Sequence, residues 1–272
     1  MRDHLIISHT RFPQAFAGDD TRIEFRREQI DRGYISTVNH QGRSASMLNS
    51  TALSAHPVFG PYVNPLDGQI AASFERLADL NRDGYTGAAL AREIDIQLAR
   101  VKPVLRTAID GVREIRGNLQ LRRVRGMSFD HSEGAPLRAD LRQWFLSHGP
   151  SERIKLAMSA DWNLAVALIE VGREYCGLEP EIWVRVEDRF MALNHVRVAG
   201  LDASYVIAST TELLTGAGTD HAGAFAVAEM AVRDYHEEIA LLELAEDYFQ
   251  SVVKALMLVS GEPAHEIVGV GD

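Results

Sequence analysis

The stretch GAFAVAEMAVRDYHEEIALLELAEDYFQSVVKALMLVSG, residues 223–261, contains no proline and no glycine between its two ends. Apolar residues recur in it at alternating spacings of three and four, which is the pattern of a helix that packs along one stripe. The predicted stripe consists of Phe225, Ala228, Val232, Tyr235, Ile239, Leu242, Glu246, Phe249, Val253 and Leu256. At 1.5 Å per residue, this helix would be roughly 55–60 Å long.

Further helices are predicted before this stretch, with caps, glycines or prolines at their ends. Their expected ranges are 151–176, 180–199 and 202–216. Residues 127–272 are therefore expected to form a helical bundle. A second region, residues 69–126, is expected to be a helix–turn–helix whose second helix is long and kinked near Pro103. A strand or extended connection is expected at LQLRRV, residues 119–124.

Residues 1–68 show little sustained periodicity. They are rich in Ser, Asn, Gly and Pro after residue 38, and only residues 21–33 suggest a short helix. Long irregular stretches in a compact domain are uncommon and are often functional or wrapped around a partner. The sequence therefore predicts a mainly α fold: a helical bundle with a long C-terminal helix and an extended, largely irregular N-terminal arm.

The composition is that of an ordinary globular protein, with 272 residues, 46% hydrophobic and 24% charged. Cys176 is the single cysteine, so an intramolecular disulfide is excluded. No stretch approaches the roughly 20 apolar residues that a membrane helix needs. We expect a cytoplasmic protein, or one incorporated into an assembled particle, with no membrane partner.

The net charge of −10 is distributed unevenly along the chain. Residues 1–130 contain 18 Lys and Arg against 15 Asp and Glu, whereas residues 131–272 contain 10 against 23. The acidic second half argues against nucleic acid as a partner, because phosphates would repel it. Two interpretations remain: basic and acidic surfaces associate head to tail, or both are simply solvated.

The stretch DLNRDG, residues 79–84, begins like a calcium loop. Asp79, Asn81 and Asp83 provide oxygens at alternate positions, and Gly84 permits the sharp turn. Over these six residues the sequence resembles EF-hand and dockerin-type loops, but Leu90 stands where the closing bidentate acid belongs. A polar turn between two helices is therefore favoured, and calcium, the one candidate cofactor, is the alternative.

Some carboxylates fall on the apolar side of predicted helices. Asp161 is placed opposite the polar face of helix 151–176, and Asp234 and Glu238 lean into the apolar half of the long helix. Buried charges must be paired or must bind a metal. The first interpretation is internal pairing or a subunit interface; the alternative is a carboxylate site, metal-binding or catalytic, between bundle helices. The predicted bundle helices contain no Glu-x-x-His motif, which disfavours a di-iron site.

An arginine cluster near residue 120 is a candidate interface, because guanidinium groups recognise carboxylates and phosphates. Its members are Arg116, Arg122, Arg123 and Arg125. No aromatic residue alternates with them, so single-strand nucleic-acid binding is disfavoured and an acidic surface of a neighbouring subunit is favoured. Glu246 within the apolar stripe resembles a polar residue that fixes packing register.

No nucleotide-binding or nucleophile motif is found in the sequence, and the run Asp130–Glu133 is predicted to be a loop before a helix. We therefore expect a non-catalytic structural or interaction subunit of a homo-oligomeric or multi-subunit assembly, such as a phage-type particle. The alternative is an all-helical enzyme with a carboxylate site formed by Asp161, Asp234 and Glu238.

Overall fold

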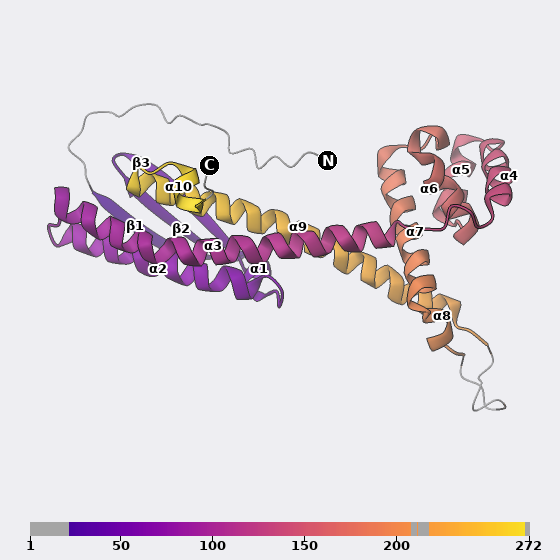
Figure 1. Ribbon diagram of the computed structural model, residues 1–272, viewed down its shortest axis with the longest axis horizontal. Coiled ribbons are helices and arrows are strands. Elements are labelled where there is room, and N and C mark those ends of the chain that lie inside the picture. The colour runs from indigo at the N-terminus through magenta and orange to yellow at the C-terminus, as the bar shows by residue number, and fades with distance from the viewer. Residues whose placement is uncertain (1–21, 208–210, 212–217, 270–272) are drawn as a thin grey trace. The chain divides into compact units, whose positions relative to one another are not determined.

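The computed structural model describes residues 22–207, 211 and 218–269 (Figure 1). The fold is mainly α, as predicted, and its long C-terminal helix is α9 (His221–Ser260). The chain forms two compact units: one built from residues up to Arg113 together with those from Leu241 on, the other from Glu114–Ala240. Two 40-residue helices, α3 (Gly87–Gly126) and α9, contribute to both units.

A small antiparallel sheet occupies part of the N-terminal region of the first unit. Its strands β1 (Ile23–Ile30), β2 (Gly33–His40) and β3 (Arg43–Ser50) follow one another in the order of the chain. The short helix predicted over residues 21–33 is therefore wrong. Residues 1–21 of the expected arm lie outside the described residues.

Successive side chains of a strand point to opposite faces of the sheet, so every second residue lies on the face that is buried. The inner face carries Ile23, Phe25, Val38 and Met47, of which all but the half-buried Phe25 are buried. The turn between β2 and β3 has positive φ at both Gln41 (51°) and Gly42 (70°), which suits the twist of a two-residue hairpin.

Helices α1 (Thr51–Ala55), α2 (Gly60–Arg82) and α10 (Ala264–Val268) complete the first unit. Helix α2 packs on β1, where the rings of Phe25 and Phe74 stack with centroids 5.8 Å apart. A Cβ atom at Gly111 of α3 would lie 2.1 Å from the ring of Tyr62 in α2. The glycine therefore permits the close approach of these two helices.

The strand or extended connection predicted at residues 119–124 is also wrong, because these residues continue α3 to Gly126. Leu119 is 1% exposed and extends the apolar face that includes Val112 and Ile115. Burial of that face outweighs the roughly 1 kcal/mol helix cost of Gly117. The expected boundary between the N-terminal arm and the helix–turn–helix, at residue 68, lies inside α2. The expected boundary before the helical bundle, at residue 126, coincides with the end of α3.

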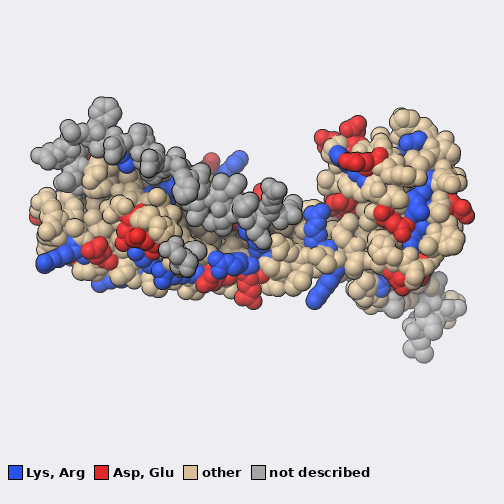
Figure 2. Space-filling view, turned by 45° about the horizontal axis from the view of Figure 1, so that its top comes forward, with Lys and Arg blue, Asp and Glu red and all other residues tan. Residues whose placement is uncertain are grey.

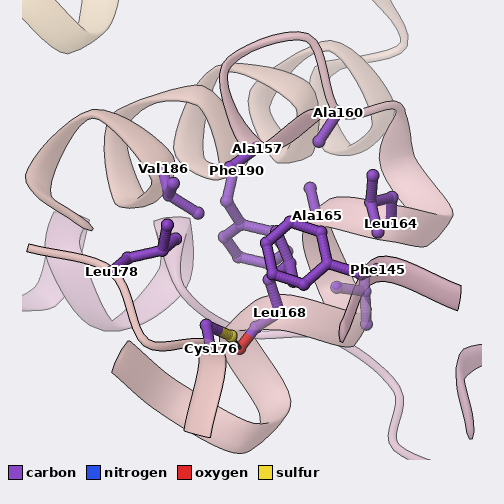
Figure 3. Close-up of a cluster of buried hydrophobic side chains, with 11 residues drawn as sticks. Phe145, Ala157, Ala160, Leu164, Ala165, Leu168, Cys176, Leu178, Val186 and Phe190 are labelled. Atoms are coloured by element: carbon purple, nitrogen blue, oxygen red, sulfur yellow. Dashed lines mark hydrogen bonds between the residues drawn. The ribbon is translucent and has the colours of Figure 1, made fainter. Parts of the chain in front are cut away.

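The second unit is a set of shorter helices together with the adjoining parts of α3 and α9. These are α4 (Ala135–Leu146), α5 (Pro150–Met158), α6 (Trp162–Cys176), α7 (Pro180–Ala199) and α8 (Leu201–Ser204). Phe145, Leu168 and Phe190 meet in their core (Figure 3). Burial at the edge of this core raises the pKa of the Cys176 thiol to about 11, so the thiol stays protonated at neutral pH.

The single helix predicted over 151–176 is two helices, α5 and α6, separated at residues 159–161. Asp161 caps the second one: its Oδ1 accepts a hydrogen bond of 2.9 Å from the backbone N–H of Leu164. In the described part of the helix expected over 202–216, α8 ends at Ser204, and a bridge joins Val206 to Thr219. Residues 208–210 and 212–217 lie outside the described residues.

The apolar stripe of α9 is broader than predicted. Its predicted members Ala228, Val232, Tyr235, Leu242, Phe249 and Leu256 are buried, but so are Ala224, Ala245, Tyr248, Val252, Ala255 and Val259. No helix in the described part of the chain is long and apolar enough to cross a membrane.

Candidate functional site

A hollow of about 420 Å³ in the second unit lies where α7 and the first half of α9 face each other. We call it the arginine pocket. Its lining consists of Met158, Arg185, Asp188, Arg189, Glu229, Val232, Arg233 and His236. Three guanidinium groups therefore surround one recess.

Helical periodicity places these side chains. Residues three and four apart share one face of a helix, so Arg185, Asp188 and Arg189 line the pocket from α7. Glu229, Arg233 and His236 do the same from α9. Rigid helical backbone, rather than a loop, therefore positions the charged groups.

Arg189 is fixed by two further contacts. Its Nε donates a 2.6 Å hydrogen bond to the carbonyl of Ala160, and its guanidinium lies 5.0 Å from the ring centroid of Phe225. The side chain is half-buried. Arg185 and Arg233 also line the pocket and are exposed.

Asp188 and Glu229, the acidic groups of the pocket, form no ion pair with its arginines in the described residues. Asp188 is paired with His236, with Oδ1 and Nε2 2.6 Å apart. In the described part of the chain, no carboxylate oxygen lies within 4.0 Å of a nitrogen of Arg185, Arg189 or Arg233.

A second hollow of about 330 Å³ lies beside the loop before α4. It is lined by Phe129, Asp130, Glu133, Gly134, Arg138, Trp162, Asn163, Val166 and Arg197. Arg197 pairs with Glu133 at 2.6 Å and stacks over the Trp162 ring at 4.8 Å. Its charged groups are thus already matched within the chain.

The buried Arg138 organises that loop. Its guanidinium donates to the carbonyls of His131 and Glu133 and to both carboxylate oxygens of Glu170, at 3.1 Å each for Glu170. With a further bond from Arg142 at 2.5 Å, these contacts lower the pKa of Glu170 to about 2. The run Asp130–Glu133 is a loop before a helix, as predicted.

The residues of the calcium-like stretch are not brought together. Asp79 and Asn81 lie in the last turn of α2, where side chains two residues apart point in nearly opposite directions, and Asp83 is the C-cap. The amide oxygen of Asn81 accepts a 3.1 Å hydrogen bond from the backbone of Ile23, and Asp79 pairs with Arg82. Gly84, with φ of 93°, forms the turn to α3.

Asp161, Asp234 and Glu238, the carboxylates of the alternative enzyme site, each lie in a different environment. Asp161 is an exposed helix cap, and Asp234 is exposed on α9. Glu238 pairs with Arg122 at 2.8 Å. Within residues 22–207, 211 and 218–269, no group of three or more His, Cys, Asp and Glu side chains is arranged to hold a metal ion.

The arginine cluster of the sequence lies on the last turns of α3. Arg122 also stacks near Tyr235, at 5.6 Å, and Arg123 pairs with Glu187 at 3.3 Å. Arg125 is exposed, and Arg116 and Glu246 each have an interaction partner. Acidic and basic side chains are interspersed on the face drawn in Figure 2.

Sequence reasoning did not single out Arg185, Arg189 or Arg233 of the arginine pocket. On one helix, such residues are indistinguishable from a solvated polar face. The signal in the sequence was the pair Arg185 and Arg189, because like charges four residues apart on a helix repel each other and indicate that another group stabilises them. Comparison with protein-family models, curated proteins and solved structures found no match.

Proposed function

We propose that this protein is a non-catalytic interaction subunit, which associates with other copies of itself through its small sheet and so builds a homo-oligomeric or larger assembly, such as a phage-type particle. The observation that supports this function best is the outer edge of β3. In the described part of the chain, no strand pairs with this edge.

Exposed strand edges are usually protected, because their unpaired N–H and C=O groups can pair with another chain. The other edge strand, β1, has such protection in Glu24, Arg26, Arg27 and Glu28. Strand β3 has the sequence RSASMLNS, whose single charge is at its first residue, Arg43. The unprotected edge is thus the one available for pairing.

Apolar side chains exposed on the outer face of the sheet also favour association at the β3 edge. Leu48 of β3 is 45% exposed and lies directly opposite Ile35 of β2. Ile30, at the end of β1, is 36% exposed. These apolar side chains would lose water-accessible area if the sheet continued into a second copy.

A second copy is the partner that fits this edge. Two β3 strands running antiparallel around a two-fold axis would present the same surface to each other, which closed dimers require. Main-chain hydrogen bonds would supply affinity, as in other cases of strand addition. A dimer formed in this way is the simplest unit of the proposed assembly.

Sedimentation velocity at micromolar concentration tests this function. We expect the native chain to sediment as a dimer or larger species, and the double variant Ser46→Lys/Leu48→Lys to shift towards monomer, because like charges would face each other across the new strand pair. The control is Ala72→Lys, an exposed position on α2. A monomeric native chain, or a double variant that associates like the native chain, would contradict the proposal.

A further inference from the structure

The arginine pocket has a property that subunit association through β3 does not require. Arg185, Arg189 and Arg233 converge on one recess without an acidic partner in the described residues. We infer that this pocket binds a small molecule through an oxyanion group, a phosphate or a carboxylate.

The charge arrangement points to an anion. Cations that share a recess repel one another, and an anion between them converts that repulsion into attraction. A guanidinium has five N–H donors in a planar fork, which matches the paired oxygens of a phosphate or carboxylate. Guanidinium groups from two different helices can therefore grip one oxyanion from two sides.

The size and the walls of the recess suit a small organic ligand. Its volume of about 420 Å³ is within the range of roughly 300–1,000 Å³ that is usual for small-molecule sites. Val232, which is 8% exposed, and Met158 give it an apolar wall. Such a wall keeps water away from one side of the ion pair and strengthens it.

The remaining charged groups limit how much negative charge the ligand can carry. Asp188 is occupied by His236, whereas Glu229 lines the pocket with no partner within ion-pair distance in the described chain. Glu229 would repel a pure anion and would accept a hydrogen bond from a ligand hydroxyl or amine. The site thus fits one oxyanion group accompanied by a donor.

Isothermal titration calorimetry on the full chain, at constant ionic strength, tests the inference. The probes are phosphoethanolamine and lactate, in separate titrations. Each combines one oxyanion group with a hydrogen-bond donor, and together they distinguish a phosphate site from a carboxylate site. The variant is Arg185→Met/Arg233→Met, which leaves the structural contacts of Arg189 intact. The matched control is Arg92→Met/Arg100→Met, two exposed arginines of α3 in the other unit.

We expect saturable binding of at least one probe with one site per chain. The pocket variant should bind it at least about tenfold more weakly, because charge-assisted hydrogen bonds are lost. The control should bind like the native chain, and Glu229→Gln should bind more tightly. No heat from either probe, or equal affinity in the pocket variant and the native chain, would overturn the inference.

Discussion

At the scale of single residues, a buried polar contact of the first unit joins three of its elements. The hydroxyl of Tyr248 in α9 donates to Asp67 of α2 at 3.1 Å, and Arg27 of β1 pairs with the same carboxylate at 2.5 Å. Burial, together with the neighbouring carboxylate, raises the pKa of Tyr248, so its hydroxyl remains a donor over the physiological pH range. A strand and two helices are thereby fixed at one point.

Removing that hydroxyl should cost stability without removing the ring. We expect Tyr248→Phe to lower the free energy of unfolding by about 1–2 kcal/mol, because Asp67 loses one of its donors in a buried position. Urea denaturation measures this change. Tyr85→Phe is the control, since Tyr85 is 45% exposed. Equal stability of the two variants would show that the hydrogen bond contributes nothing.

Glu170 should make the stability of the second unit depend on pH. Its folded-state pKa is lowered from 4.5 to about 2 by hydrogen bonds from Arg138 and Arg142. A carboxylate with a lowered pKa contributes stability above its unfolded pKa and loses it as the pH falls towards the folded value. This contribution should therefore be complete above about pH 4.5 and should decline between pH 4.5 and 2.

Urea midpoints measured from pH 7 to pH 2 test this dependence. Glu170→Gln should be less stable than the native chain at pH 7, and the difference should shrink below pH 4.5. Glu174→Gln, an exposed neighbour on the same helix, should follow the native curve throughout. A difference between native chain and Glu170→Gln that stays constant down to pH 2 would contradict the assignment.

At the scale of elements, long periodic segments could be predicted closely. The predicted helix 180–199 is α7 with the same bounds, because Pro180 begins it and Gly200, with φ of 63°, ends it. Helix α9 was equally evident from its uninterrupted apolar spacing. In both, local residues alone specify the element.

The sheet could not be predicted in the same way, because its strands depend on partners elsewhere in the chain. Its inner face includes the buried polar residues Ser36, His40 and Asn49, so apolar alternation is broken. The arginine pocket escaped prediction for a related reason. Arg185 and Arg233 come from different helices, and only packing of α7 against α9 brings them to one recess.

Asp161 illustrates how one missed break changes the interpretation of a residue. On a continuous helix it would face the apolar side, whereas at the start of α6 it accepts a hydrogen bond as N-cap. We expect Asp161→Ala to lower the free energy of unfolding by about 1 kcal/mol and Asp161→Asn to change it little, since asparagine also caps helices. Thermal denaturation distinguishes the two. Equal losses would argue for a role of the charge instead.

At the scale of the whole molecule, association and ligand binding are proposed for different units. The β3 edge belongs to the unit formed by residues up to Arg113 and from Leu241 on, and the arginine pocket belongs to Glu114–Ala240. Lysines on β3 should therefore leave oxyanion binding unchanged, and methionines in the pocket should leave sedimentation unchanged. The two proposals can fail separately.

The way the chain passes between its units has a consequence for its synthesis. The chain leaves the first unit after Arg113, forms the whole second unit, and returns at Leu241. On the ribosome, the second unit is therefore complete before the first unit has received the part of α9 that contains Tyr248. Until then, the nascent first unit lacks both the tyrosine partner of Asp67 and the buried apolar side chains that α9 contributes after Leu241.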